Sequence, residues 1–323
     1  MKADVLSDVL RAVRLTGAVY FDFELSSPWV AEAPPSREIA GKVMPGAQRV
    51  IEYHVIARGA CWGHAIGQEP IRLREGDLIV FPQGDAHVLS SAPGMRAAPD
   101  MSVFARPSTP LPLVYELGGG GPDRARVVCG FLGCDERPYN PLLTALPAVI
   151  HLSAANPQAP QATTGWLGTL LSIAVGESGS ARAGSENVLA RLSELMFVEA
   201  IRRYLETLPP TQTGWLAGLR DTSVGQALAA LHGEPSQPWT VEGLARLVGL
   251  SRSVFAERFT EMVGQPPMQY LALWRMQLAS RLLVEGAQVA AVASAVGYES
   301  EAAFSRAFKK LVGQAPATWR RGN

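Results

Sequence analysis

Cysteine is scarce in this chain of 323 residues, which has three: Cys61, Cys129 and Cys134. A number this small and odd excludes a disulfide scaffold in a chain of this length. The sequence also lacks a run of about twenty apolar residues without a charge, so no segment is expected to span a membrane. The start of the chain mixes apolar and acidic side chains, unlike a secretory signal, and we therefore expect a cytoplasmic protein.

An excess of charge of either sign is missing as well. The 29 Lys and Arg residues balance the 29 Asp and Glu residues, which by itself argues against a nucleic-acid binder. The balance hides an asymmetry, because residues 217–323 hold 11 basic and 8 acidic residues, a net charge of +3 that leaves −3 for the rest. A modestly basic C-terminal part is compatible with contacts to DNA phosphates. The length and a hydrophobic content of 47% predict two compact globular units.

Residues 1–150 carry the pattern of a β-rich domain. Short runs of β-branched and aromatic residues, separated by turn residues, cover 50–56, 71–73, 77–81 and 125–130. Such spacing predicts a sandwich or a barrel. From about residue 140 the pattern becomes helical, and the longest expected helix covers 188–207, after a candidate N-cap at Ser185. This helix either packs on the β-rich domain or forms a dimer face.

The C-terminal third contains one helical motif twice. Each copy is a helix, a turn with a glycine and a second helix, over 240–262 and again over 289–312, with a connecting helix over 268–286. Gly249 and Gly297 occupy matching turn positions, where glycine can adopt a positive φ. This order predicts two helix-turn-helix units, whose second helices can lie in the major groove of DNA. The side chains expected to face the core are Val254, Phe255, Phe259, Met262, Trp274, Phe304, Phe308 and Trp319.

The second copy carries further motifs: Val-x-x-Val-Ala at 289–293, Gly-Tyr-x-Ser at 297–300, Phe-Ser-Arg-Ala-Phe-Lys at 304–309, Gly-x-x-Pro at 313–316 and Trp-Arg at 319–320. With these motifs the last 100 or so residues resemble the DNA-binding domain of the AraC/XylS family. The resemblance implies base contacts from Ser253, Ala256, Glu257, Glu301, Ala302, Ser305 and Arg306.

The chemistry of these side chains agrees with such contacts. Arg306 suits a bidentate contact to guanine, and Glu257 can accept a hydrogen bond from a cytosine amino group. Arg258 is either a DNA contact or a surface ion-pair partner. Contacts to the phosphate backbone are expected from Lys309, Lys310, Arg320 and Arg321.

A different motif lies in the β-rich part. Residues 76–87 fit the pattern Gly-(x)5-Pro-x-Gly-x-x-His, which is similar to the second motif of the cupin barrel, and residues 53–62 resemble a reduced first motif. The His-x-His pair and the following Glu of that first motif are absent, so an ordinary dioxygenase site is not expected. The front half as a whole resembles the cupin-type domain of an AraC-family subgroup that includes regulators of the reactive-chlorine response.

His54, His87 and Cys129 match positions that recur in that subgroup, which implies that they converge inside the barrel. Two imidazoles and a thiolate suit zinc, copper or another transition metal. Three interpretations stay open: a metal site, a redox-reactive thiol without a metal, and a set of structural core residues. His64 and Cys61 are weaker candidates. Cys129 could also pair with Cys134 as a switchable disulfide.

These features predict an α+β multidomain protein. It comprises a cupin-like β-barrel over 1–150, a helical connector over 151–215 and an all-α domain with two helix-turn-helix units over 216–323. The predicted function is that of a DNA-binding transcription regulator, an activator or a repressor, controlled by a small molecule, metal or oxidant sensed in the N-terminal domain. A cupin-type metal-dependent enzyme is the alternative, disfavoured by the incomplete metal motif. Promoter DNA and RNA polymerase are the expected partners, and a homodimer is an option.

Overall fold

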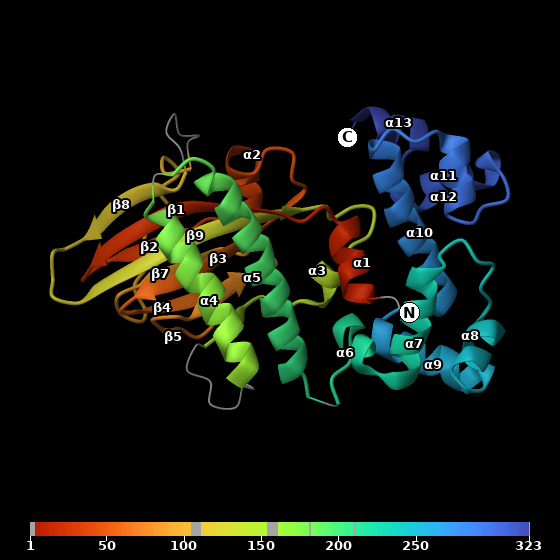
Figure 1. The fold of residues 1–323 in the computed structure, drawn as a ribbon, viewed down its shortest axis with the longest axis horizontal. Helices are drawn as coiled ribbons and strands as arrows, with labels where there is room; N and C mark the ends of the chain where they lie inside the picture. Colours follow the sequence, from red (N-terminus) through yellow and green to blue (C-terminus); the bar gives the residue numbers. More distant parts are fainter. Residues whose placement is uncertain (1–3, 105–110, 154–160, 181, 210, 323) are drawn as a thin grey trace. The chain divides into compact units, whose positions relative to one another are not determined.

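A computed structural model describes residues 4–104, 111–153, 161–180, 182–209 and 211–322. By the contacts between its residues, the chain divides into two compact units. The β-rich unit consists of Leu15–Cys134 and Leu146–Thr207, and the helical unit consists of Met1–Arg14, Asp135–Ala145 and Leu208–Asn323. Figure 1 labels their elements. Within the described residues, no helix is long and apolar enough to cross a membrane.

Two sheets form the β-rich unit. The larger has the strand order β10 (Ile150–Leu152), β6 (Leu78–Phe81), β3 (Arg49–Arg58), β9 (Arg124–Cys134), β1 (Thr16–Ser26) and β8 (Leu113–Gly118). The smaller has the order β2 (Val30–Ala33), β7 (His87–Ser90), β4 (Ala60–Ala65) and β5 (Ile71–Arg74). Neighbouring strands are antiparallel except β1 and β8, which run parallel. A short 3-10 turn (Ser36–Glu38) and α2 (Ala40–Val43) precede β3. The sandwich or barrel predicted from the sequence is confirmed.

One hydrophobic core joins the two sheets. It contains Phe21, Val127 and Phe131 from the larger sheet together with Leu73 and Leu89 from the smaller one. Residues of a strand alternate between its two faces, so every second side chain of β1, β3 and β9 points into this core. The functional side chains of these strands therefore lie between the sheets when they occupy inward positions.

Helices α4 (Gln161–Ser178) and α5 (Ser185–Thr207) belong to the β-rich unit. Helix α5 packs along β1, and Gly17 permits the approach because an added Cβ would clash with Ser193 and the carbonyl of Ala190. The Tyr53 hydroxyl, on β3, lies 2.5 Å from the Ser193 hydroxyl. The helix thus packs on its own β-rich unit, one of the two options that the sequence left open. The sequence predicted a separate helical connector over 151–215, whereas the structure places α4 and α5 in the β-rich unit. The reason is that α5 packs its apolar side on the larger sheet.

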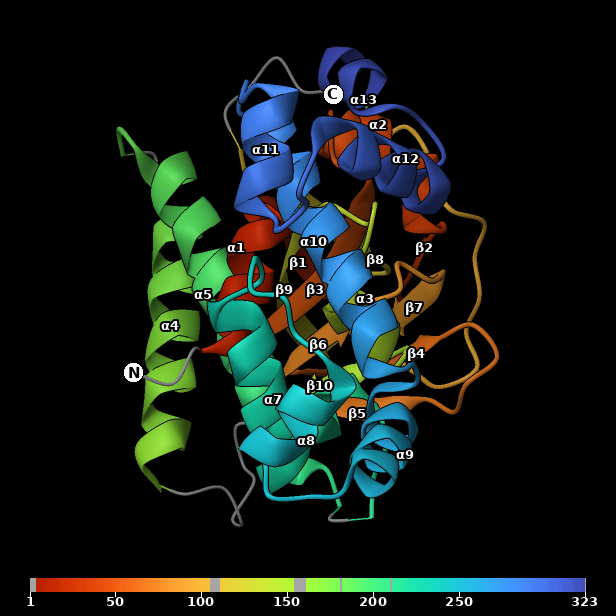
Figure 2. The ribbon, with the colours of Figure 1, turned by 90° about the vertical axis from the view of Figure 1, so that its right-hand side faces the viewer.

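The helical unit contains the two predicted helix-turn-helix units. After α6 (Trp215–Arg220) and α7 (Thr222–Gly233), the first unit is α8 (Val241–Leu247) with α9 (Arg252–Val263). Helix α10 (Pro267–Val284) follows, then α11 (Val289–Ala295) with α12 (Glu301–Val312), and α13 (Pro316–Gly322) closes the chain. Figure 2 shows α10 running from the α7–α9 group to the α11–α13 group. Sequence and structure agree within two residues at every end of these motif helices.

Most of the core expected for this unit is confirmed. The described side chains of Phe255, Phe259, Trp274, Phe304, Phe308 and Trp319 are buried. The expectation for Val254 is wrong, because that side chain is 50% exposed. Phe255 and Phe259 define the inward stripe of α9 at a spacing of four residues, and Val254 lies about 100° from Phe255 around the helix.

The helical unit also contains two segments from the first half of the chain, Met1–Arg14 and Asp135–Ala145. The sequence did not predict that these segments belong to this unit. Helix α1 (Val5–Ala12) and α3 (Pro141–Ala145) belong to it. The buried amide of Gln277, on α10, donates to the carbonyl of Ala12 at 2.9 Å and accepts from the backbone N–H of Tyr139 at 3.0 Å. Arg14 and Asp135 form a bidentate ion pair at 2.6 and 2.8 Å between the ends of the same segments. Gln277, on α10, thus holds two segments that are distant in sequence through hydrogen bonds to their backbone.

Candidate ligand pocket and nucleic-acid interface

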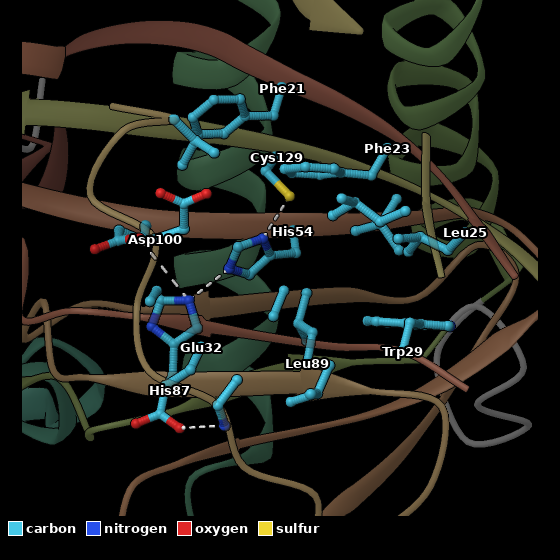
Figure 3. A pocket seen from close by; sticks show the side chains of 18 of the residues that line it. Phe21, Phe23, Leu25, Trp29, Glu32, His54, His87, Leu89, Asp100 and Cys129 are labelled. Carbon is cyan, nitrogen blue, oxygen red and sulfur yellow. Dashed lines mark hydrogen bonds and ion pairs between the residues drawn. The ribbon is translucent and has the colours of Figure 1, made fainter. Parts of the chain in front are cut away.

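A cavity of about 220 Å³ lies within the β-rich unit, between its two sheets. Figure 3 shows its lining, with Phe21 and Phe23 above a row of polar groups that runs from Cys129 through His54 to His87. His54 comes from β3, His87 from β7 and Cys129 from β9. Cys129 and His54 are direct neighbours across β3 and β9. The structure therefore brings together all three residues that the sequence put forward.

The three side chains form a continuous chain of contacts. The Cys129 Sγ lies 2.8 Å from His54 Nδ1, and His54 Nε2 lies 2.7 Å from His87 Nε2. His87 Nδ1 lies 3.0 Å from the carbonyl oxygen of Asp85. A carbonyl only accepts, so Nδ1 of His87 carries the proton and its Nε2 accepts from His54. His54 Nδ1 is then an acceptor, and the Cys129 thiol donates to it.

The pKa shifts agree with this neutral arrangement. Burial lowers the pKa of His87 to about 4, and burial followed by the neighbouring His87 lowers the pKa of His54 well below its usual value. Burial likewise raises the pKa of Cys129 well above that of a free thiol. Removing a charge from water into an apolar interior is costly, so each group is held in its uncharged form. In this state Cys129 is a thiol and not a reactive thiolate.

Glu52 also belongs to the cluster, and the sequence analysis missed it. Its Oε2 lies 3.8 Å from His87 Nε2, and its Oε1 has no hydrogen-bond partner among the described residues. Burial raises the pKa of Glu52 to about 8. The available signal was its position two residues before His54 on the same strand, which puts both side chains on one face.

The donor set fits a transition metal ion. One ligand atom each of Glu52, His54 and His87 lies within 4.8 Å of the others. A carboxylate and two imidazoles are a common set for zinc, and two Zn–N bonds of about 2.0 Å would separate the nitrogens to about 3.3 Å. That is a small widening of the present contact. Cys129 faces the other nitrogen of His54, so an ion held by Glu52, His54 and His87 would have Cys129 as a hydrogen-bond partner of His54 and not as a direct ligand.

The weaker candidates take no part in this row. Cys61 is buried in the core, and burial raises its pKa to about 12. His64 is buried on β4, with an Nδ1 that has no hydrogen-bond partner among the described residues. None of the three cysteines forms a disulfide bond. Cys129 and Cys134 lie five positions apart on one strand and point to opposite faces of the sheet, so they do not face one another.

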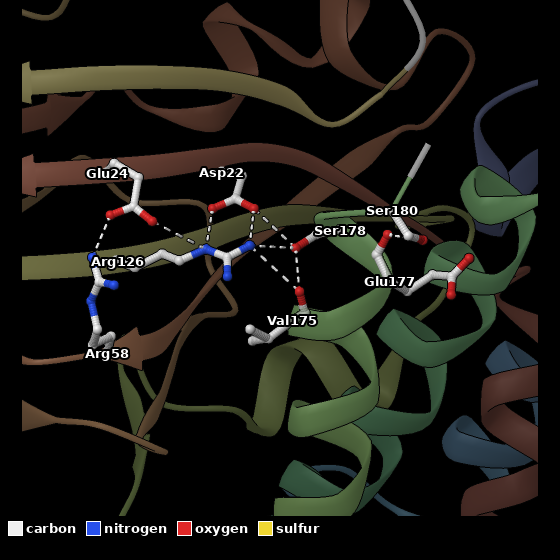
Figure 4. Close-up of polar contacts among 8 residues, drawn as sticks. All are labelled: Asp22, Glu24, Arg58, Arg126, Val175, Glu177, Ser178 and Ser180. Carbon is white, nitrogen blue, oxygen red and sulfur yellow. Dashed lines mark hydrogen bonds and ion pairs between the residues drawn. The ribbon is translucent and has the colours of Figure 1, made fainter. Parts of the chain in front are cut away.

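The outer faces of the lining strands carry a polar network (Figure 4). Arg126, on β9, donates to both carboxylate oxygens of Asp22, on β1, at 2.9 and 2.6 Å. The hydroxyl of Ser178, at the end of α4, donates to the same carboxylate at 3.0 Å. The hydrogen bond to Asp22 raises the pKa of Arg126. Because Phe21 precedes Asp22 on β1, one strand lines the cavity on one face and binds α4 on the other.

The proposed DNA-reading positions lie on the outer sides of α9 and α12. Glu301, Ala302 and Arg306 are exposed on α12, as are Ser253 and Glu257 on α9; Ala256 and Ser305 are half-buried. Lys309, Lys310 and Arg321 are exposed and Arg320 is half-buried.

Arg258 is engaged differently from the other candidates. Its Nη2 donates to Asp221 Oδ2 at 2.5 Å, and Asp221 also caps the N-terminus of α7. The structure thus shows the ion pair that was one of its two interpretations.

Comparison with known proteins gives two family matches. Residues 4–206 match a family model described as a cupin, and residues 244–322 match one described as a helix-turn-helix domain. An AraC-like transcription regulator of Streptomyces lividans is 36% identical over 278 residues, which cover 85% of this chain and 88% of that protein. The HTH-type transcriptional regulator AlkR of Acinetobacter baylyi is 31% identical over 83% of this chain and 90% of its own. The RCS-specific transcriptional activator RclR of Escherichia coli is 26% identical over 85% of this chain and 86% of its own length.

Proposed function

This chain belongs to the family of AraC-like transcription regulators with a cupin N-terminal domain, and from that premise we propose how it reads DNA and what controls it. Helices α9 and α12 enter two successive major grooves of a promoter. Glu52, His54 and His87 bind a transition metal ion, with zinc as the first candidate. Oxidation of the Cys129 thiol beside this ion is the signal that the cluster senses. The chain acts on transcription and not as an enzyme.

The DNA-reading part of the proposal is supported by the exposed sides of the two recognition helices. Both helices begin at a serine N-cap and bury a Phe pair, which fixes the side that remains free. The proposed base contacts are Ser253, Ala256, Glu257, Glu301, Ala302, Ser305 and Arg306, with Lys309 and Arg320 on phosphates. Arg258 stabilises the domain through Asp221 in this proposal.

The sensing part is supported by one observation above all, the row of contacts from Cys129 through His54 to His87. An ion held by Glu52, His54 and His87 would fix the spacing of β3 and β7 and supply a positive charge beside the thiol. That charge would lower the pKa of Cys129 through His54, which makes the thiol open to oxidation. The name of RclR describes an activator specific for reactive chlorine species, and we propose an oxidant-responsive activator here as well.

Partners follow from the same premise. We propose RNA polymerase as the partner of the DNA-bound form and a second copy of this chain as the partner of the β-rich unit. Val188 and Leu195 on α5 and Ile173 on α4 are exposed apolar residues, which suits a contact between copies. The cytoplasm is the compartment in which such a regulator works.

A pair of variants on one helix tests the DNA-reading proposal. Arg306→Ala should cost roughly 1–3 kcal/mol on the correct operator and relax the base preference at one position. Lys309→Ala, one turn further along α12, should weaken binding to all sequences about equally. Fluorescence anisotropy with operator and scrambled duplexes over a range of salt concentrations measures both effects. Wild-type operator affinity in Arg306→Ala would overturn the assignment.

A further inference from the structure

The cavity beside the cluster is larger than a metal site needs. Five of its lining side chains are aromatic: Phe21, Phe23, Trp29, Phe104 and Phe131. The Phe21 ring lies 5.7 Å from Phe104 and 6.2 Å from Phe131, both in edge-to-face arrangements, and 5.3 Å from Phe23. Rings arranged in this way can contact another ring through their edges and their faces, so the aromatic lining of the cavity favours an aromatic ligand.

The charges of the lining exclude an anion. None of the described lining residues is Lys or Arg, whereas three of them are acidic. Glu32 is held by a bidentate pair with Arg96 at 2.7 Å, and Asp100 accepts from Ser102 at 2.6 and 2.9 Å. In the chain without a metal ion, a carboxylate or phosphate ligand would lose its hydration here and meet no lysine or arginine among the described lining residues, and that loss is costly. The ligand therefore carries no negative charge.

A polar atom at the cluster end lacks a partner. Glu52 lines this cavity and is 2% exposed, and its Oε1 has no hydrogen-bond partner among the described residues. An unsatisfied buried oxygen is costly, and a ligand that satisfies it gains that free energy. A hydroxyl group both donates and accepts, so it can pair with this oxygen whether or not the carboxyl group holds a proton.

The size of the cavity limits the ligand to one ring. A dry engineered cavity of about 150 Å³ holds benzene. The present volume of about 220 Å³ leaves room for a ring, a hydroxyl group and a short alkyl substituent. We propose that this cavity binds an uncharged single-ring phenol as an effector, with the hydroxyl on Glu52 and the ring among Phe21, Phe104 and Phe131. This assignment rests on the proposed regulatory function and names a ligand class for the sensing domain.

Calorimetric titration of the purified full chain, freed of metal with a chelator, at neutral pH tests the assignment with three probes of similar shape. We expect 4-ethylphenol to bind, ethylbenzene to bind at least about tenfold more weakly because it lacks the hydroxyl, and 4-ethylbenzoate not to bind. Glu52→Leu should remove the difference between 4-ethylphenol and ethylbenzene. Leu89→Trp should fill the cavity and weaken both by at least about tenfold, whereas Val114→Trp, on an exposed position of β8, should change neither.

The outcomes separate this inference from the regulatory function itself. Equal binding of 4-ethylbenzoate, or no preference for the phenol over ethylbenzene in the wild-type chain, overturns the ligand class. Failure of all three probes with a chain that still binds operator DNA overturns this inference alone. Failure of operator binding in the anisotropy measurement overturns the proposed function instead. Should Leu89→Trp not fold, as judged by its thermal unfolding, the comparison of probes in wild type and Glu52→Leu still decides.

Discussion

The imidazole of His54 has a different task at each nitrogen. Its Nε2 faces His87, where the proposed ion binds, and its Nδ1 faces the thiol of Cys129. An ion held at Nε2 would leave Nδ1 with the proton, so the sulfur would then accept a hydrogen bond instead of donating one. In this proposal Cys129 would influence the ion through the His54 ring and would not be a direct ligand.

This difference predicts unequal effects of two substitutions on metal affinity. His87→Ala removes a direct ligand and should reduce bound zinc from about one ion per chain to a trace. Cys129→Ser removes a partner of a ligand and should weaken affinity about 10- to 100-fold, which is the usual effect of such a partner. Competition titration with a chromophoric zinc chelator measures both. Equal loss of zinc in both variants would mean that the His54 ring turns and that Cys129 is itself a ligand.

His232, in the helical unit, gives a prediction for pH. Trp215 Nε1 donates to the Tyr270 hydroxyl at 2.9 Å, and the same hydroxyl lies 2.7 Å from His232 Nε2, to which it can donate when that nitrogen carries no proton. Burial lowers the pKa of His232 to about 3 from an ordinary 6.5. A depressed pKa contributes stability above the unfolded value of 6.5, and this contribution is lost as the pH falls toward 3.

Between pH 6.5 and 5 this group alone should therefore cost the helical unit up to about 1.4 kcal/mol per pH unit, and about half of that slope at pH 6.5 itself. His232→Gln keeps an acceptor for Tyr270 but does not titrate, so its stability should fall less over the same range. Thermal unfolding at pH 7.5 and pH 5, followed by circular dichroism, compares the two chains. Parallel losses in both would show that other groups govern the acid sensitivity.

At the scale of single residues, the sequence predicted which side chains meet but not all of their roles. His87 was predicted because it ends a motif with fixed spacing. His54 and Cys129 were predicted because they match positions that recur in the AraC-family subgroup. Glu52 has no such motif around it, although its position two residues before His54 puts both side chains on one face of β3. Its contact with His87 depends on how the larger sheet packs on the smaller one, which results from many non-local contacts that no local pattern records.

At the scale of elements, local signals made the helical repeat predictable. Thr240, Ser251 and Ser300 are side-chain N-caps in the structure, and the turns contain glycines with a φ of +71° at 249 and +79° at 297. Caps and left-handed turns are properties of a few adjacent residues, which is why the ends of these helices agree. The addition of α1 and α3 to the helical unit depends on contacts such as those of Gln277, which no local pattern records.

The two glycine turns predict unequal costs for one substitution. Gly249→Ala and Gly297→Ala both place a Cβ on a left-handed residue, which costs roughly 1–2 kcal/mol. At Gly249 the added Cβ meets nothing within 4 Å, whereas at Gly297 it clashes with the backbone of Ser236. Gly297→Ala should therefore lower the melting temperature more than Gly249→Ala does. Differential scanning calorimetry of the two variants measures this, and equal shifts would contradict the close approach at Ser236.

At the scale of the whole molecule, the chain passes between its two units at four points: 14/15, 134/135, 145/146 and 207/208. The first two lie at the ends of β1 and β9, the strands that carry Phe21 and Cys129. A change of strand position at the cavity is thereby connected through the chain itself to the segments that Gln277 holds. Couplings between sites typically amount to 1–3 kcal/mol, so an effector should change DNA affinity about 5- to 150-fold.

Helix α10 determines how much DNA one chain can cover. Its 18 residues make a rod of about 27 Å, with a helix-turn-helix unit at each end. Successive major grooves on one face of DNA are about 34 Å apart, a distance that two recognition helices on such a rod can span. One chain should therefore protect roughly two helical turns of asymmetric sequence in hydroxyl-radical footprinting. Arg306→Ala should weaken protection in the half contacted by α12 and leave the other half closer to wild type. Protection confined to one groove per chain would show that only one helix-turn-helix unit reads the operator.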